Sequence, residues 1–417
     1  MSLLSIKNKI GIPSDWKMVP IGKVLISSQY GTSNGNSETG VPVVGMKNLQ
    51  DGKVDFNDLP FVSVSNEEKE SLLLHDGDIL LNRTNSYDLV GKIGFVDKAV
   101  EAVFASYLVR LQVDRAKSDP KFVALWLTSF WADQMIKKIA TRAVSQANVN
   151  PTEFKKFCLV PVLPKPEQKA IADLLSTWDE AIEKTERLIQ TKGKKLNALY
   201  QSYFRVDSST TKSWEPVKVG KFVTPRNEKA VPTEEQPLYS LTIENGITEK
   251  TERYNREFLV KDAGNKTYKV VHPGDIVFNP ANLRWGAIAR STVDHKVVLS
   301  PIYEVLQIKD NAIDPDFLTH ALTCPRQIAI YATKTEGTLI ERMAVKLDAF
   351  LLLKIRAPSS ISEQKEIAKT LSNAQQEIDL LKQLAEKYKT QKRGLMQKML
   401  TGEWRVKPEI VNQYREA

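Results

Sequence analysis

The chain has 417 residues, of which 42% are hydrophobic and 26% charged, so it is long enough for two or three domains with their own cores. It shows neither an apolar run of membrane-spanning length nor a leader pattern, and we expect a soluble, cytoplasmic protein. The net charge of +9 is spread along the sequence, which is compatible with a polyanionic partner but is weak support for one.

The globular part of the sequence occurs twice. WKMVPIGKV at Trp16 corresponds to WEPVKVGKF at Trp214, and HDGDILLNR at His75 corresponds to HPGDIVFNP at His272. Further on, DPKFVALWLTS corresponds to DPDFLTHALTC. A similarity with such a steady offset predicts one structural unit repeated along the chain, with pseudo-two-fold symmetry.

Each globular part predicts an α+β domain. Short β-branched and aromatic runs, separated by Gly, Asn and Asp, indicate a twisted, mainly antiparallel sheet. A helix is expected at about Pro120 to Ile139 and again at Pro315 to Tyr331. In the His-x-Gly-Asp-Ile turns we expect Gly77 and Gly274 to take left-handed backbone angles, and we assign these turns a structural role.

Two matching helices follow the two globular parts. They begin at the Glu-Gln-Lys sequences of Glu167 and Glu363 and run to about Phe204 and Leu400. Their apolar residues recur in steps of four and three, which is the seam of a coiled coil. The predicted seam comprises Ile171, Leu175, Trp178, Ile182, Ile189, Leu196, Leu199, Ile367, Leu371, Ile378, Leu381, Tyr388, Leu395 and Met399.

Such a seam is also typical of a plain dimerisation zipper, but the repeat around it favours pairing of the two helices with each other. We expect an antiparallel coiled coil, a spacer of about 50 Å, with Ile171 opposite Met399. Trp178 then faces Lys392 as a cation–π pair, and Ile182 faces Tyr388. The predicted boundaries are 1–163 and 207–358 for the domains, 164–206 and 359–401 for the helices, and 402–417 for a tail.

Motifs for catalysis are weak. No phosphate-binding loop occurs, and NPAN at Asn279 and NPTE at Asn150 lack the second Pro and the aromatic residue of an adenine methyltransferase pocket, so both are interpreted as turns. The Glu-Gln-Lys sequences could be half of a nuclease metal site, but their position at helix starts favours a structural role. Cys158 and Cys324 are far apart and indicate neither a disulfide nor a zinc site, and no metal site is predicted.

Two Gly-Asp-Ile domains alternating with two Glu-Gln-Lys helices resemble the specificity subunit of type I restriction-modification enzymes over essentially the whole chain. The resemblance implies two target recognition domains, each reading one half of an asymmetric bipartite DNA target, with the coiled coil setting the spacing. It implies a non-catalytic subunit that binds two adenine-N6 methyltransferase subunits and two restriction and translocation subunits. S-adenosylmethionine, ATP and Mg²⁺ are then expected in those partners, with no cofactor in this chain.

DNA contacts are expected in two polar loops of each domain, because Arg, Asn and Gln pair with base edges and Lys with phosphates. The second domain has Pro280 where the first has Arg83, so that contact is expected to move to Arg284. The predicted contact residues are Asn82, Arg83, Asn85, Lys92, Arg142, Ser145, Gln146 and Asn148 in the first domain, and Asn282, Arg284, Trp285, Lys334, Thr338 and Arg342 in the second.

Two other functions compete with this interpretation. One is a free-standing DNA-binding regulator or scaffold without enzyme partners. The other is a self-sufficient enzyme, which the missing motifs disfavour.

Overall fold

The computed structural model describes residues 10–142, 146–205, 214–249, 266–309, 311, 313–335 and 343–415. The chain forms two compact units, the first comprising Met1–Lys184 and Leu384–Ala417, the second Thr185–Gln383. Each unit therefore contains one globular domain together with part of each of the two long helices. These helices are α6 (Lys165–Phe204) and α10 (Ile361–Leu400), close to their predicted bounds.

The globular part of the first unit is built mainly from short strands. They are β1 (Lys17–Pro20), β2 (Leu25–Tyr30), β3 (Asn36–Ser37), β4 (Val41–Val44), β5 (Leu49–Gln50), β6 (Gly52–Val54), β7 (Phe61–Val62), β8 (Ile79–Asn82), β9 (Thr84–Asn85), β10 (Ile93–Phe95), β11 (Val103–Phe104), β12 (Leu108–Val113), β13 (Thr141–Arg142), β14 (Ala147–Asn148) and β15 (Leu159–Val162).

Among the described residues, the largest sheet of this unit has the order β2-β12-β8-β10-β6-β5. A second sheet, β11-β4-β7-β3, has its own small core around Val44, Val62 and Phe104. Only the β10–β6 and β11–β4 pairs are parallel among the strand pairs described here. The predicted mainly antiparallel sheet is confirmed.

The helices of the first domain are α2 (Asn66–Leu72), α3 (Pro120–Leu127), α4 (Phe130–Ile139) and α5 (Pro151–Phe157). The single helix predicted from Pro120 to Ile139 is wrong, because the chain breaks it into α3 and α4. The hydroxyl of Ser129 accepts a hydrogen bond from the amide of Ala132 and caps a new helix there. The sequence at Asn150, predicted to be a turn, is the N-cap of α5.

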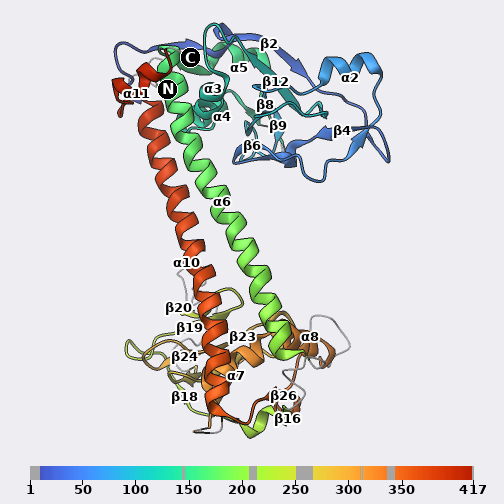
Figure 1. Cartoon of the computed structure of the whole chain (residues 1–417), viewed down its shortest axis with the longest axis vertical. Helices are drawn as coiled ribbons and strands as arrows, with labels where there is room; N and C mark the ends of the chain where they lie inside the picture. Colours follow the sequence, from blue (N-terminus) through green and yellow to red (C-terminus); the bar gives the residue numbers. More distant parts are fainter. Residues whose placement is uncertain are drawn as a thin grey trace. The chain divides into compact units, whose positions relative to one another are not determined.

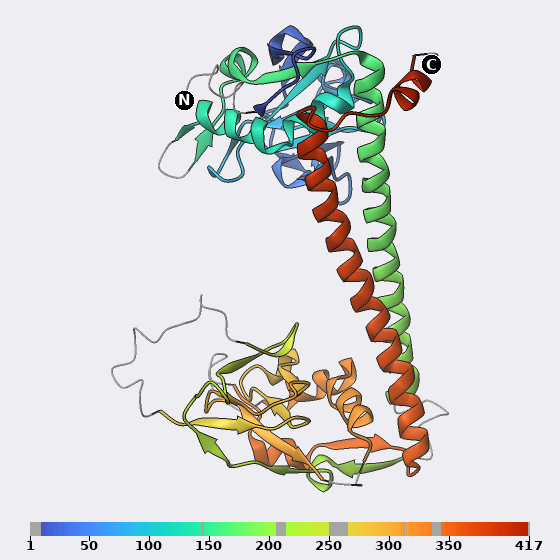
Figure 2. The same cartoon turned by 90° about the vertical axis from the view of Figure 1, so that its left-hand side faces the viewer.

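Both long helices complete the core of the first unit. Ile171 and Leu175 from the start of α6 and Met399 and Leu400 from the end of α10 are buried together with the side chains of α3 and α4. In Figures 1 and 2 these parts of α6 (green) and α10 (red) lie side by side. Burying apolar side chains stabilises by roughly 1.5–3 kcal/mol each, so the domain depends on both helices for stability.

The tail after α10 also belongs to the first unit. It contains α11 (Pro408–Gln413), and Val406 is buried in the main core. The Arg405 guanidinium bonds to Glu167 of α6 at 2.5 and 2.9 Å and to Asp15 near the start of the chain at 3.1 Å. Hydrogen bonding to Arg405 lowers the pKa of Asp15 below its ordinary value. The tail is thus fixed to the unit by charge as well as by apolar contact.

The second unit repeats this architecture. Its strands are β16 (Glu215–Lys218), β17 (Val223–Pro225), β18 (Lys229–Ala230), β19 (Tyr239–Thr242), β20 (Gly246–Glu249), β21 (Tyr268–Val271), β22 (Ile276–Phe278), β23 (Ile288–Arg290), β24 (Val297–Leu299), β25 (Glu304–Ile308) and β26 (Lys354–Ala357). In the described part of this unit the order β17-β25-β22-β23 matches β2-β12-β8-β10, and β16-β26 matches β1-β15.

The helices of the second domain are α7 (Pro315–Thr323), α8 (Pro325–Thr333) and α9 (Leu347–Leu352). The helix predicted from Pro315 to Tyr331 is again split, here because Pro325 begins a new helix. Leu196 and Phe204 of α6 and Ile367 and Leu371 of α10 are buried in the core of this unit. The two domains therefore use both helices in the same way.

Within each unit the two helices pair in the antiparallel sense. In the first unit the Trp178 and Tyr388 rings meet edge to face at 5.8 Å. In the second unit Lys192 lies 2.6 Å from Glu377, and the predicted register, with Ile171 opposite Met399, places the next residue, Ile378, opposite Lys192. All predicted seam residues are buried or half-buried. The predicted Trp178–Lys392 pair is nevertheless wrong: Trp178 contacts Tyr388, which was predicted to face Ile182, and Lys392 bonds to the carboxylate of Asp179 at 2.6 Å. A full ion pair is stronger than a cation–π contact at a half-exposed position.

The glutamines of the two Glu-Gln-Lys sequences fix the helix starts. The Gln168 side chain accepts from the Asp119 amide at 2.8 Å and donates to the Leu163 carbonyl at 2.8 Å. Gln364 makes the same two bonds, to the Asp314 amide at 2.7 Å and the Pro358 carbonyl at 2.8 Å. Both glutamines are buried, so the motif has a structural purpose in each unit. No helix in the described ranges has the length and apolar character needed to cross a membrane.

Candidate nucleic-acid interface

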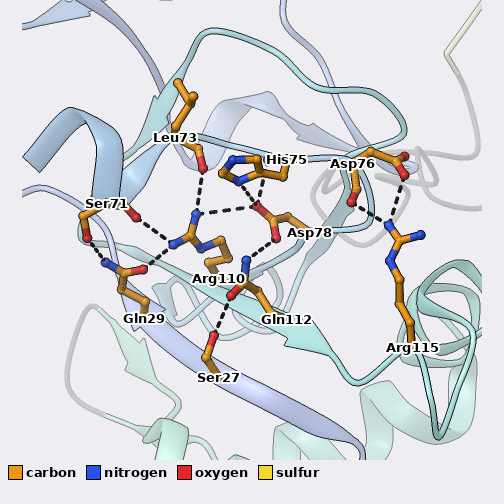
Figure 3. A network of polar contacts seen from close by, with 10 residues as sticks. All are labelled: Ser27, Gln29, Ser71, Leu73, His75, Asp76, Asp78, Arg110, Gln112 and Arg115. Atoms are coloured by element: carbon orange, nitrogen blue, oxygen red, sulfur yellow. Dashed lines mark hydrogen bonds and ion pairs between the residues drawn. The ribbon is translucent and has the colours of Figure 1, made fainter.

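The Gly-Asp-Ile turn of the first domain is built around a buried carboxylate (Figure 3). Gly77 has φ +90°, as predicted, which brings Asp78 back toward the start of the turn. The Asp78 carboxylate accepts from the His75 amide at 2.9 Å and from the Gln112 side chain at 3.1 Å. The turn therefore sets the direction in which strand β8 leaves it.

Arg110 on β12 neutralises Asp78. Its guanidinium lies 3.6 Å from the carboxylate and donates to the carbonyls of Leu73 at 2.7 Å and Ser71 at 2.8 Å. It also donates to the side chain of Gln29 on β2, the residue opposite Arg110 in the sheet. Because Arg110 and Asp78 are almost fully buried, this network fixes β2, β8 and β12 against one another.

The second domain contains the same turn with a different arginine. Gly274 has φ +84°, as predicted, and the Asp275 carboxylate accepts from the His272 amide at 2.9 Å. Here Arg226, just after β17, binds Asp275 with two nitrogens at 2.6 and 3.0 Å. His272 in turn contacts Glu228 at 2.7 Å, and this hydrogen bond lowers the pKa of Glu228.

The structure brings together the two polar loops that the sequence predicts for the first domain. Strands β13, β14 and β9 form one small sheet, in which Asn148 pairs with Thr84 and Arg142 with Ala147. The Val149 amide donates to the Arg83 carbonyl at 2.8 Å. Residues distant in the sequence therefore form one polar face at the end of β8.

Arg83 lies at the centre of this face. Its guanidinium stacks on the Tyr30 ring, with 5.0 Å between the guanidinium carbon and the ring centroid. Its Nε donates to the Ser106 carbonyl at 3.3 Å and its Nη1 to the Asn148 side chain at 3.5 Å. The half-exposed side chain is thus held in one direction, which reduces the entropy lost when it binds a ligand.

Other predicted residues of this face differ in exposure. Arg142 is exposed and stacks on Tyr87 at 3.5 Å, and Lys92 and Gln146 are exposed as well. Asn85 is half-buried, and its side chain accepts from the Ser86 amide at 2.8 Å.

Asn82 is fully buried, with no described hydrogen-bond partner for its side-chain amide. It therefore cannot reach DNA in this conformation. Ser145 lies outside the described residues.

The corresponding face of the second domain has an equivalent backbone framework with different side chains. The Val345 amide donates to the Pro280 carbonyl at 3.0 Å, the equivalent of the Val149–Arg83 bond. The short helix η8 (Leu283–Trp285) carries Arg284, whose guanidinium stacks on the exposed Trp285 at 4.1 Å. Asn282 is half-buried at the start of η8, and Lys334 is exposed after α8. Thr338 and Arg342 lie outside the described residues.

Two of the predicted arginines are held by Tyr30 and Tyr87, which were not among the residues predicted from the sequence. Tyr30 lies far from Arg83 in the sequence, and only the pairing of β2 with β12 brings it near. Each of these faces thus combines guanidinium groups with aromatic rings and amides, the side chains that bind phosphates and base edges. Within the described ranges, no group of three or more His, Cys, Asp or Glu could hold a metal ion.

The chain is similar to proteins that specify DNA sites. Residues 13–191 match the model of the type I restriction modification DNA specificity domain. The putative type I restriction enzyme MjaX specificity subunit of Methanocaldococcus jannaschii is 25% identical over 96% of this chain and 96% of its own length. The EcoKI specificity subunit of Escherichia coli is 25% identical over 41% of this chain and 38% of its own length.

The fold also matches a solved structure. The S subunit of a type I restriction-modification system from M. genitalium superposes with a TM-score of 0.61 at 16% identity, covering 93% of this chain and 96% of that one. The fold and the matched domain define a class of protein, namely one built on DNA specificity domains with paired long helices. Within that class, the chain is similar over nearly its whole length to specificity subunits of type I restriction-modification enzymes.

Proposed function

We propose that each unit of this chain reads one half of an asymmetric bipartite DNA target for a type I restriction-modification complex. The observation that carries the proposal is the pair of faces at equivalent places in the repeat. Both are built on a Gly-Asp-Ile strand and a returning loop, but one presents Arg83 and the other Pro280 and Arg284. Equivalent frameworks with different side chains suit the recognition of two different base sequences.

The partners follow from the same proposal. The chain binds two adenine-N6 methyltransferase subunits and, for cleavage, two restriction and translocation subunits. S-adenosylmethionine, ATP and Mg²⁺ then act in those subunits, while this chain selects the site. The two long helices, which complete both domain cores, set the gap between the half-sites.

The test is methylome sequencing of cells with and without the gene. The proposal expects N6-methyladenine at one bipartite, non-palindromic motif that disappears when the gene is deleted and returns when it is restored. A methylome that does not change on deletion contradicts the proposal. Co-purification of the chain with a methyltransferase subunit separates it from a free-standing DNA-binding regulator.

A further inference from the structure

We infer that Arg83 reads a guanine in the major groove and that Tyr30 is the positioning residue that aims it. The inference rests on the proposed function and assigns a base type to one position of one half-site. Neither residue occurs at the equivalent place in the second domain, where Pro280 and Asn227 stand. The assignment therefore concerns the first unit alone.

Neighbouring groups fix the orientation of the Arg83 guanidinium. An arginine has five N–H donors in a planar fork. Two of its three nitrogens are engaged, Nε by the Ser106 carbonyl and Nη1 by the Asn148 amide oxygen. Among the residues that the structure describes, Nη2 has no hydrogen-bond partner. Three donors are left over, one on Nη1 and two on Nη2, so each of these two nitrogens keeps a donor for a ligand.

The donors of Arg83 match the acceptors of guanine. Two parallel donors at the tip of an arginine bind the O6 and N7 acceptors of guanine, and adenine offers an acceptor and a donor at the same places. The exposed Tyr30 ring covers one face of the guanidinium and so restricts rotation of the Arg83 side chain. A phosphate also accepts from arginine, but it does not need the plane of the fork to be fixed by a ring on one side and an amide on the other.

The position of Tyr30 beside Arg83 depends on the glycine that follows it. Tyr30 pairs with Val109 on β12, and the next residue is Gly31. A Cβ at Gly31 would collide with the Phe104 carbonyl oxygen, so only glycine lets the chain pass this closely. The backbone at Gly31 is therefore held against β11, and the preceding Tyr30 has its ring over the Arg83 guanidinium.

The main test compares the methylomes produced by the full chain, co-expressed with its methyltransferase, as wild type and as variants. Arg83→Lys keeps the charge but not the fork, and we expect loss or relaxation of one guanine position in one half-site, with the other half unchanged. Tyr30→Leu should have a weaker effect at the same position, and Tyr30→Phe should restore the wild-type motif. Arg115→Lys, an exposed arginine bound to Asp76, is the matched control and should leave the motif unchanged.

Duplex binding by the purified methyltransferase complex gives a second readout. Replacing the assigned guanine by 7-deazaguanine removes one acceptor, and the wild type should lose roughly 5- to 150-fold in affinity. The Arg83→Lys complex should lose little further, since the contact is already gone. Thermal unfolding of the variants should match the wild type, which excludes a merely structural effect.

Two results overturn the inference alone. One is an unchanged motif for Arg83→Lys. The other is a uniform loss of affinity for all duplexes together with a shallower salt dependence, which identifies a phosphate contact. If the wild-type chain yields no bipartite motif at all, the proposed function fails, and the inference fails with it.

Discussion

Arg226 binds the buried carboxylate of Asp275 in the second unit, as Arg110 binds that of Asp78 in the first. The two arginines come from opposite strands of equivalent strand pairs. The Arg226 backbone amide donates to the Val305 carbonyl at 2.9 Å. Arg226 corresponds to Gln29 of the first unit and Val305 corresponds to Arg110, and Gln29 and Arg110 also pair across the strands. In both units an arginine neutralises a buried carboxylate in the turn, but it stands on one strand of the pair in the first unit and on the other strand in the second.

Substitution of Arg226 by Gln should destabilise the second unit by about 3–5 kcal/mol, because it leaves Asp275 buried without a countercharge. Arg226→Lys should cost less, since it retains the charge and loses one of the two bonds. Urea unfolding followed by a probe in the second unit measures both. Arg326→Gln, an exposed arginine of the same unit, is the control, and an equal effect of Arg226→Gln and Arg326→Gln would contradict the prediction.

The buried Gln168 should be as important to its unit as an apolar core residue. Gln168→Ala leaves the Asp119 amide and the Leu163 carbonyl without their partner, and we expect a loss of about 1–3 kcal/mol for each. Gln397→Ala, an exposed glutamine of the same unit, should change the stability by less than about 0.5 kcal/mol. The comparison is made by thermal unfolding, and Gln364→Ala should reproduce the result in the second unit.

Removal of the Arg405 side chain should release the tail. Glu167 is then a nearly buried carboxylate without its partner, and we expect a loss of about 1–2 kcal/mol in tail docking, screened by the partial exposure of Arg405. Limited proteolysis with mass spectrometry should show cleavage within the tail, residues 402–417, roughly 5- to 30-fold faster. Arg393→Ala, an exposed arginine of α10, should leave the cleavage rate unchanged; an equal rate for both variants would sink the idea.

His320 should make the second unit sensitive to acid. Its ring lies 2.9 Å from the Tyr200 hydroxyl of α6 and 2.9 Å from the Ser372 hydroxyl of α10, and burial lowers its pKa below the ordinary 6.5. A lowered folded pKa means that the unfolded chain binds the proton more tightly. The stabilisation is therefore complete above pH 6.5 and is lost as the pH falls below it.

Urea unfolding of the second unit between about pH 5 and 8 tests this dependence. His320→Gln should flatten the profile across that range, and His295→Gln, an exposed histidine, should leave it unchanged. The first unit has Leu125 at the equivalent place and should lack the dependence. A profile that stays steep in His320→Gln would assign the acid sensitivity to another group.

If the long helices set the target spacing, their length should change it. One heptad inserted into both α6 and α10 adds about 10 Å of helix, close to three base pairs at roughly 3.4 Å each. The gap in the methylated motif should grow by that amount, with both half-sites retained. An unchanged gap would refute the idea that the helices act as a spacer.

The sequence predicted the duplication, both long helices and the antiparallel sheets, because periodic patterns and repeated motifs record local geometry directly. One of its errors missed a local capping signal, and another depends on a tertiary contact. The helix from Pro120 is split by the Ser129 cap, and Lys392 bonds to Asp179 because that carboxylate comes within 2.6 Å. A seam pattern selects which residues face inward but does not choose among the partners within reach.

The candidate interface was predictable by residue type and loop, but not by burial or by its aromatic partners. Asn82 follows the Gly-Asp-Ile strand as Arg83 does, yet the pleat turns one side chain inward and the other outward. Tyr30 is joined to Arg83 only through the pairing of distant strands. Such long-range neighbours leave no mark in a single sequence.

Because each core is completed by segments of both long helices, the recognition domain is not a module that can be cut out at its own boundaries. An exchange between related genes that joined a foreign domain to the native helices would pair Ile171 and Met399, or Phe204 and Ile367, with side chains never matched to them. Functional hybrids with new DNA targets should therefore have their crossover points inside the helices. Recombination then transfers each globular domain together with the helix segments that complete its core.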